Sequence, residues 1–294
     1  MSTYTPSSLS ISDRKADAPI GMFDSGIGGL SVALEVLKYL PNENILYYAD
    51  TAHVPYGARS DEEIRQLTAD AIEWLYEQGC KVAVVACNSA SAFSLDSLRQ
   101  KYGESFPIIG LVPAVKPAVI QSKSKVIGVL ATPATFRGKL IKDVIDNFAI
   151  PAGAKVIPIT CLDLVPLVEN GQIFTQTCYN ILKTHLDPII AQGADQLVLG
   201  CTHYPFLKPA IIDIYDKKLN LVDSGQAVAR QCGRILQKHY LLKKNIEYNV
   251  SSIKCVVSGN NAENVRYILL NLLGKQVNWK IFNLSDYKAL NHLR

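Results

Sequence analysis

The chain has 294 residues, of which 48% are apolar, and its 30 Lys and Arg against 26 Asp and Glu give a net charge of +4. This length suits two domains of about 100–150 residues each. So mild a charge, without a block of Lys and Arg, argues against a nucleic-acid partner, and no apolar run of about 18 residues predicts a membrane span.

The first residues, MSTYTPSSLSISDRKADAP, are polar and rich in serine, and they lack the apolar centre of a signal peptide. We therefore expect residues 1–18 to form a flexible tail and the protein to be cytoplasmic. The chain has seven cysteines and no CxxC pair, so neither a zinc site nor a disulfide framework is expected, and we predict no metal site.

The chain alternates expected strands with expected helices. Apolar runs predict strands in PIGMFDSG, NILYYADT and KVAVVAC, and the last run lacks polar alternation, as is typical of a parallel strand covered on both faces. Helical spacing appears in SVALEVLKYL, between the first two runs. This alternation predicts a parallel sheet with right-handed crossovers.

The clearest predicted helix lies in SDEEIRQLTADAIEWLYEQG. Ser60 and Glu63 form the pattern of a capping box, in which each side chain bonds the backbone amide of the other. An apolar stripe follows, and Gly79 is expected to end the helix.

The same order of elements then begins again. KVIGVLATPATFRG resembles PIGMFDSGIGG in form, and VIPITCLDLVPLVENG and DQLVLGCTHYP follow it as second and third counterparts. The repetition predicts an α/β protein of two similar doubly wound parallel-sheet lobes. Open sheets of this kind bind ligands at the carboxyl ends of their strands, so the active site is expected in the cleft between the lobes.

Two of the predicted strands end on a cysteine, Cys87 and Cys201, and each cysteine is followed by small polar residues. Facing thiols suit inversion at a carbon that bears a weakly acidic hydrogen, because one removes the hydrogen and the other returns one to the opposite face. A thiol has an ordinary pKa of about 8.5, which helix N-termini and cations can lower. Each cysteine precedes an expected helix start, so a favourable dipole is expected at both.

Seven motifs in this order resemble the glutamate racemases of the cofactor-independent aspartate/glutamate racemase superfamily. They span roughly residues 20–230 and read FDSGIGGLSV, YYADTAHVPYG, VVACNSASA, GVLATPATFRG, CLDLVPLVENG, LVLGCTHYPFL and LVDSGQAVA. The resemblance implies an isomerase that interconverts L- and D-glutamate without a cofactor. It also implies a role in peptidoglycan biosynthesis, and so in cell-wall biogenesis and cell shape.

By this resemblance, Cys87 and Cys201 are the two acid/base residues. Asp24 is the helper near the first thiol, and His203 and Glu169 are the helpers near the second. The matching substrate-binding positions are Asp24, Ser25, Pro55, Tyr56, Gly57, Asn88, Ser89, Thr132, Thr135, Thr202 and His203.

The resemblance further implies that the lobes are not consecutive. The first lobe would hold residues 19–115 and 229–294, and the second lobe residues 116–228. We expect a monomer or a homodimer with glutamate as its small-molecule substrate, and no nucleic-acid or membrane partner. Some family members with N-terminal extensions respond to a cell-wall precursor, so an activator of that kind is also conceivable.

Other interpretations stay open. Aspartate racemase, or another cofactor-independent amino-acid racemase, is the nearest alternative. A cysteine hydrolase would use Cys201 as nucleophile and His203 as base, but it has no use for Cys87. A binding protein could also have two lobes around a cleft. SGIGGL is either a tight strand-to-helix turn or a place where substrate approaches backbone amides, and His53 is interpreted as structural.

Overall fold

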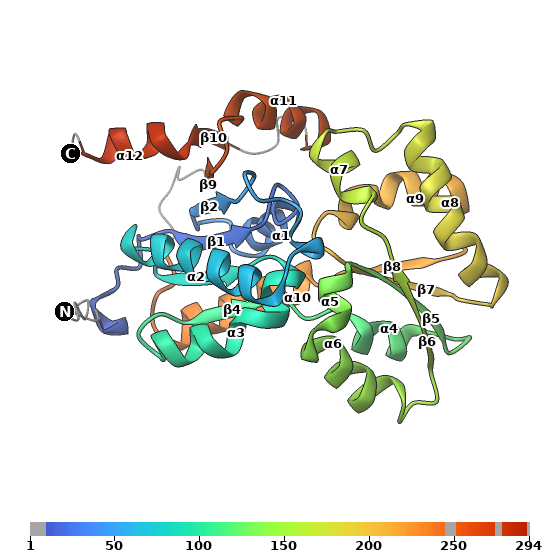
Figure 1. Cartoon of the computed structure of the whole chain (residues 1–294). Coiled ribbons are helices and arrows are strands. Elements are labelled where there is room, and N and C mark those ends of the chain that lie inside the picture. The colour runs from blue at the N-terminus through green and yellow to red at the C-terminus, as the bar shows by residue number, and fades with distance from the viewer. Residues whose placement is uncertain (1–9, 245–250, 274–277, 293–294) are drawn as a thin grey trace.

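The computed structural model describes residues 10–244, 251–273 and 278–292, and it shows two lobes side by side, each built on a parallel sheet (Figure 1). Among the described residues, the first sheet has the strand order β10-β9-β2-β1-β3-β4 and the second the order β6-β5-β7-β8. The predicted α/β class with two doubly wound parallel sheets is confirmed.

The first sheet contains strands from both ends of the chain. Its strands are β1 (Ile20–Asp24), β2 (Ile45–Ala49), β3 (Val82–Val85), β4 (Ile108–Gly110), β9 (Ser252–Val257) and β10 (Asn278–Asn283). The helices around it are η1 (Ile11–Asp13), α1 (Leu30–Tyr39), η2 (Tyr56–Ala58), α2 (Asp61–Glu77), α3 (Asn88–Tyr102), α10 (Gly225–Lys238), α11 (Ala262–Leu273) and α12 (Leu284–His292). Strand β9 pairs in parallel with β2, so the C-terminal segment completes the first lobe.

The second lobe is continuous in the chain. Its strands are β5 (Val126–Ala131), β6 (Lys155–Thr160), β7 (Gln196–Gly200) and β8 (Asn220–Val222). Its helices are α4 (Val115–Gln121), α5 (Pro133–Arg137), α6 (Lys139–Val144), η3 (Ile145–Ala149), α7 (Leu164–Glu169), α8 (Gln176–Ala191), η4 (Tyr204–Leu207) and α9 (Lys208–Tyr215). In the described part of the chain, none of the helices combines the length and the apolar character that crossing a membrane requires.

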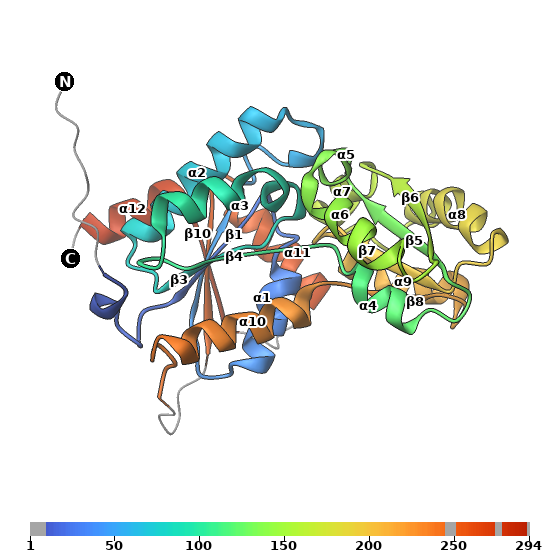
Figure 2. The ribbon, with the colours of Figure 1, turned by 90° about the horizontal axis from the view of Figure 1, so that it is seen from below.

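Helices cover both faces of the first sheet, as the unbroken apolar strands require. Figure 2 shows α2 and α3 on one side of this sheet and α1 and α10 on the other. Successive side chains of a strand point to opposite faces. Thus Met22 of β1 packs in the core under α1 and α10, whereas Phe23 packs in the core under α2 and α3.

Helix α2 shows how far local signals determine an element. Ser60 is its N-cap and accepts a hydrogen bond from the Glu63 amide at 3.2 Å, and Gly79 follows the helix with a φ of +73°. Both ends therefore lie where they were predicted. The Glu63 carboxylate pairs with the Arg59 guanidinium, so the Ser60 half of the expected capping box is formed and the carboxylate is used elsewhere.

The expected N-terminal tail is docked along the part that the structure describes. Residues 1–9 lie outside the described residues. Arg14 is buried: its Nε donates to the Ser105 carbonyl at 2.7 Å, and its guanidinium lies 4.4 Å from the Phe106 ring centroid. A cation over an aromatic ring with a backbone bond anchors this segment to the first lobe, which its polar composition did not indicate.

Two chain crossings connect the lobes. One lies between β4 and α4, and the other between β8 and α10. Ser224 in the second crossing donates its hydroxyl to the Val112 carbonyl in the first at 2.6 Å, so the two crossings are bonded to each other.

A buried ion pair in the first lobe allows a test of how much such a pair contributes to the stability of the fold. Lys81 and Glu43 are 0% and 2% exposed, their Nζ and Oε2 atoms lie 2.5 Å apart, and Lys81 also donates to the Leu241 carbonyl. Lys81→Ala leaves the Glu43 carboxylate buried without its cation. We expect it to lower the free energy of unfolding by about 3–5 kcal/mol, measured by urea denaturation.

The matched control is Lys101→Ala, which removes a pair with Glu73 whose side chains are 49% and 39% exposed. Surface pairs of this kind are worth about 0–1 kcal/mol. Equal losses in the two variants would contradict the buried-pair argument.

Candidate active site

The two predicted thiols lie in one cavity between the lobes. Cys87 follows β3 and is the N-cap of α3, and Cys201 follows β7; their exposed fractions are 4% and 7%. The cavity is lined by Ser25, Pro55, Tyr56, Gly57, Cys87, Asn88, Ser89, Thr132, Val165, Cys201, Thr202 and His203. The parallel sheets explain this meeting, because the carboxyl ends of both sets of strands open on the same cleft.

Three predicted site residues do not line the cavity but form hydrogen bonds to residues that do. Asp24 accepts a hydrogen bond from the Thr202 hydroxyl at 3.2 Å, Glu169 bonds His203, and Thr135 bonds Thr132. Val165 lines the cavity, and sequence reasoning missed it. It stands within the quoted motif CLDLVPLVENG, but an apolar side chain carries no chemical signal.

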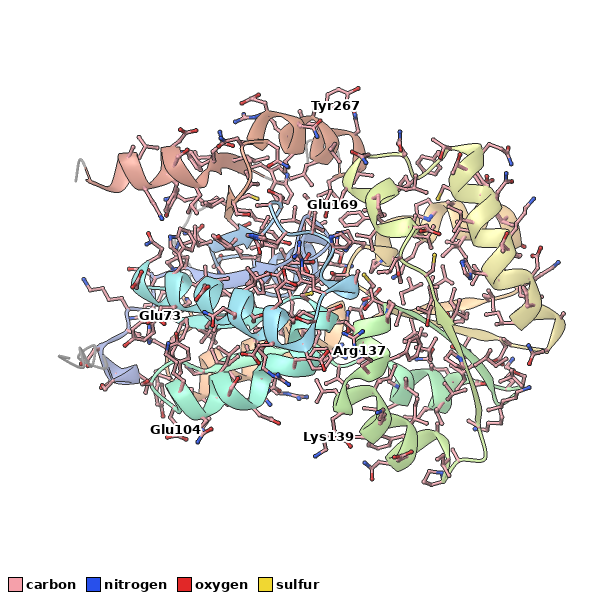
Figure 3. The ribbon with its side chains drawn as sticks, in the orientation of Figure 1. Glu73, Glu104, Arg137, Lys139, Glu169 and Tyr267 are labelled. Carbon is pink, nitrogen blue, oxygen red and sulfur yellow. The ribbon has the colours of Figure 1, made fainter. Side chains whose placement is uncertain are left out.

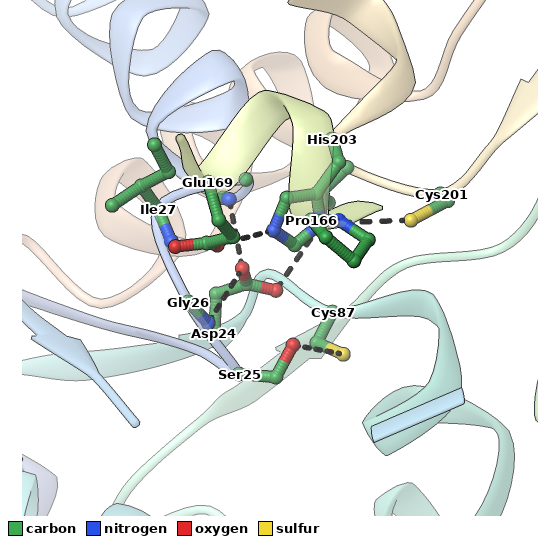
Figure 4. Close-up of polar contacts among 12 residues, drawn as sticks. Asp24, Ser25, Gly26, Ile27, Cys87, Pro166, Glu169, Cys201 and His203 are labelled. Atoms are coloured by element: carbon green, nitrogen blue, oxygen red, sulfur yellow. Dashed lines mark hydrogen bonds and ion pairs between the residues drawn. The ribbon is translucent and has the colours of Figure 1, made fainter. Parts of the chain in front are cut away.

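The Asp24 carboxylate links the glycine turn to the other lobe. Its Oδ1 accepts hydrogen bonds from the amides of Gly26 and Gly29 at 3.2 and 3.0 Å, and its Oδ2 faces Thr202 (Figure 4). Burial raises the pKa of this carboxyl from its usual 3.8 to about 6, even though the nearby charge of His203 and the two amide bonds act in the opposite direction.

Cys87 is surrounded by groups that favour its neutral form. Burial, and then the negative charge of Asp24, raise the pKa of the Cys87 thiol well above its usual value. The expected helix contact exists, since the Ala90 amide donates to Sγ at 3.4 Å, and the Ser25 hydroxyl lies 3.8 Å from the sulfur. These two bonds lower the pKa of Cys87 by less than burial raises it, so the expected helix contact is present but does not bring this pKa below its usual value.

Cys201 has a different partner. Its Sγ lies 3.6 Å from Nδ1 of His203, and Nε2 of that ring lies 2.5 Å from Oε1 of Glu169 (Figure 4). Burial lowers the pKa of His203, but its hydrogen bonds to Cys201 and Glu169 outweigh burial and raise that pKa well above its usual value. The result is a thiol–imidazolium–carboxylate chain in which a protonated ring can donate to the sulfur.

Hydroxyl groups form a second polar wall that spans the lobes. Ser89 of α3 lies 2.9 Å from Thr132 of the second lobe, and Thr132 lies 3.0 Å from Thr135. Beside them, Oδ1 of Asn88 is buried and has no hydrogen-bond partner in the described part of the chain. Such an acceptor is costly unless a bound molecule supplies the donor.

The glycine turn after β1 is shaped by close approach of the second lobe. A Cβ placed on Gly28 would lie 2.5 Å from Nδ1 of His203, and a Cβ on Gly26 would lie 2.0 Å from Oε1 of Glu169. No side chain fits at either position without displacing these groups. Of the two interpretations left open for SGIGGL, the structure supports the tight turn. The groups that approach the backbone of this turn are side chains of the other lobe.

The cavity is small and partly open. It has room for about 10 Å³, the space that a single water molecule needs. At the lobe boundary, Arg137 of α5 pairs with Asp61 at the start of α2 at 2.9 Å, and Figure 3 shows Arg137 and Glu169 along this boundary. A molecule larger than water therefore needs the residues that line the cavity to move apart before it can bind.

Comparison with known proteins identifies the class. The sequence pattern of the Asp/Glu/hydantoin racemase family matches residues 32–232. The chain belongs to this family. It is 56% identical to the glutamate racemase of Deinococcus radiodurans over 76% of this chain and 77% of that one. It is 40% identical to the glutamate racemase of Ectopseudomonas mendocina over 92% and 100%.

Solved structures agree with the sequence relatives. A glutamate racemase isoform from Bacillus anthracis matches with a TM-score of 0.77 and 30% identity over 91% of this chain and 98% of that one. Escherichia coli glutamate racemase, solved with L-glutamate and the activator UDP-MurNAc-ala, matches with a TM-score of 0.74 and 29% identity over 90% and 97%. The resemblance to glutamate racemases that the motifs indicated is confirmed.

The raised pKa of Asp24 predicts a pH-dependent stability. Its folded pKa of about 6 lies above the usual 3.8, so its contribution is fully present below about pH 4 and is lost as the pH rises through 6. Asp24→Asn does not titrate. We therefore expect the variant to gain up to roughly 3 kcal/mol relative to the unchanged chain between pH 4 and 7, since each pKa unit is worth about 1.4 kcal/mol.

Urea denaturation of both proteins at each pH measures this difference. The constant cost of the substitution cancels in the pH dependence. A difference that stays flat from pH 4 to pH 7 would show that the Asp24 carboxyl titrates normally.

Proposed function

We propose that this protein is a glutamate racemase that interconverts L- and D-glutamate by proton transfer at Cα between two thiols. The observation that carries the proposal is the placement of Cys87 and Cys201, which come from different lobes and line one small cavity. A cysteine hydrolase would need a single thiol with its imidazole. The second thiol in the cavity favours the racemase, and the sequence relatives support glutamate as the substrate.

The electrostatics of the site suggest a starting protonation state. His203 is protonated next to Cys201, so its N–H can stabilise a thiolate there, and burial keeps Cys87 as a thiol. The Cys201 thiolate takes the Cα hydrogen of L-glutamate, the electron pair stays on Cα, and the Cys87 thiol delivers its proton to the opposite face. D-glutamate leaves with Cys201 as thiol and Cys87 as thiolate, and the reverse reaction exchanges the two roles.

Supporting residues have separate tasks in this mechanism. Glu169 orients His203, and Asp24 holds Thr202 and the glycine turn. We propose that the unpartnered Oδ1 of Asn88 accepts a hydrogen bond from the substrate ammonium. We propose that the other predicted binding residues contact the two carboxylates and the carbon chain of the substrate. These residues are Ser25, Pro55, Tyr56, Gly57, Ser89, Thr132, Thr135, Thr202 and His203.

The proposed reaction uses no cofactor. Pyridoxal phosphate would need a lysine for its Schiff base, and the described residues that line the cavity include no lysine. The carbanion-like transition state would instead be stabilised by fixed hydrogen-bond donors and by exclusion of water, which the small size of the cavity favours.

The cellular setting follows from the family. We propose a cytoplasmic enzyme, monomeric or homodimeric, that supplies D-glutamate for peptidoglycan and has no nucleic-acid or membrane partner. A cell-wall precursor of the UDP-MurNAc-alanine type is proposed as an activator, because the Escherichia coli relative was solved with one. A hollow of about 480 Å³ beside the chain crossings contains Lys116, Lys208 and Arg230, whose charges suit an anionic nucleotide.

The activity can be measured directly. We expect L-glutamate to lose its circular dichroism signal when it is incubated with the purified protein and no added cofactor, and D-glutamate to do the same from the opposite sign. Addition of UDP-MurNAc-alanine to the same assay tests the activator. No change with L-glutamate would overturn the proposed function, and loss of signal with aspartate alone would establish the aspartate alternative.

Replacing the thiols tests the mechanism. Cys201→Ser and Cys87→Ser should each lower racemisation by at least about 10²–10⁴-fold, because a hydroxyl is a far weaker base at neutral pH. We expect Cys201→Ala to lose exchange of the Cα hydrogen of L-glutamate with D₂O, and Cys87→Ala to lose that of D-glutamate.

Mass spectrometry of each enantiomer in D₂O measures the exchange. The matched control is Cys178→Ala, because Cys178 is buried in α8 away from the cavity and its loss should change stability alone. Exchange of both enantiomers at the normal rate in both active-site variants would exclude the two-thiol mechanism.

A further inference from the structure

A buried carboxylate outside the described machinery lies directly behind the cavity. Asp50 follows the last residue of β2 and is 3% exposed. Neither the sequence motifs nor the proposed mechanism gives it a task. A buried carboxylate is costly unless it is hydrogen-bonded, so its partners indicate what it stabilises.

Asp50 accepts hydrogen bonds from three side chains. Its Oδ2 lies 2.6 Å from the Tyr56 hydroxyl, and its Oδ1 lies 2.6 Å from the Ser258 hydroxyl and 2.8 Å from Nδ1 of His53. Two of these partners belong to the loop of residues 51–57. The third follows β9, in the C-terminal segment that returns to the first sheet.

The same turn after β9 holds the start of the loop. Ser258 accepts a hydrogen bond from the Ala52 amide at 3.0 Å, and the Thr51 hydroxyl accepts one from the Gly259 amide and donates one to Asn261 at 2.9 Å. The loop is therefore bonded to the first sheet at its start by this turn and near its end by Asp50.

The far end of the loop is the part that reaches the cavity. Pro55, Tyr56 and Gly57 line it, and Gly57 lies so close to Thr132 of the second lobe that a Cβ would fall 2.7 Å from the threonine Cβ. The Tyr56 ring is buried, 6.0 Å from the Phe23 ring centroid. Its hydroxyl bond to Asp50 therefore determines where this segment stands relative to Cys87 and to the other lobe.

We propose that Asp50, supported by Ser258, is a positioning residue that holds loop 51–57 as the wall of the substrate cavity. The loop binds the substrate in both its enantiomeric forms, so loosening it weakens ground state and transition state alike. Such a change raises KM for both enantiomers and leaves kcat nearly unchanged. This kinetic consequence rests on the proposed function.

A matched pair of serines separates positioning from stability. Ser258 and Ser252 flank opposite ends of β9, and each donates its hydroxyl to a side-chain oxygen next to β2, that of Asp50 and that of Asn44 respectively. Ser258→Ala and Ser252→Ala each remove one such bond. Asp50→Asn is the stronger variant, because it changes the group that accepts all three bonds. Ser258→Thr keeps a hydroxyl at this position.

We expect Asp50→Asn and Ser258→Ala to raise KM for both enantiomers about tenfold, the effect of losing one hydrogen bond to a charged group, with kcat within about threefold of normal. Ser252→Ala should lower the unfolding midpoint by about as much as Ser258→Ala does, and it should leave KM unchanged. Ser258→Thr should recover most of the KM.

A second readout needs no substrate. The loop lines the same cavity as Cys87, so we expect iodoacetamide to label Cys87 about tenfold faster in Asp50→Asn and Ser258→Ala, measured by mass spectrometry with Cys178 as internal reference. If the protein did not racemise glutamate, the proposed function would be wrong. The labelling would still test whether Asp50 and Ser258 hold the loop in place. Normal KM and normal Cys87 labelling in both variants would overturn the proposal.

Discussion

One oxygen atom takes part in bonds to both lobes at the site. Oε1 of Glu169 accepts a hydrogen bond from the Ile27 amide of the first lobe at 2.8 Å and lies 2.5 Å from His203 of the second. Gly26 and Gly28 leave room for the carboxylate and for the ring, which lies 3.6 Å from the Cys201 sulfur in this position. The same carboxylate oxygen therefore contributes to the contact between the lobes and orients the imidazole beside one thiol.

The two thiols occupy unequal environments although the lobes repeat each other in outline. Cys87 lies near a carboxylate, and its burial disfavours a negative charge, whereas Cys201 lies beside an imidazolium. A two-base racemase needs one base and one acid at a time. The asymmetry is consistent with the proposed roles, in which Cys201 starts as the base and Cys87 as the acid.

Much of this arrangement could be predicted from the chain alone. Apolar runs that end on Cys87 and Cys201 indicate strands whose carboxyl ends share a cleft, since buried strands and polar turns are local properties. The docking of Arg14 could not be predicted, because it depends on an aromatic pair brought together by the fold. Val165 and Asp50 lie within motifs but were not singled out, because an apolar side chain carries no chemical signal and the bond of Asp50 to Ser258 forms only when the C-terminal segment returns to the first sheet.

The bond between Ser224 and Val112 ties the two chain crossings to each other. Two crossings that are tied together suit a common hinge, so we expect one lobe to turn on the other rather than to slide along it. The polar contacts across the cleft would then break as a set when the lobes part. In that case the fraction of time spent open, and not the proton transfer alone, would set how often a substrate can be exchanged.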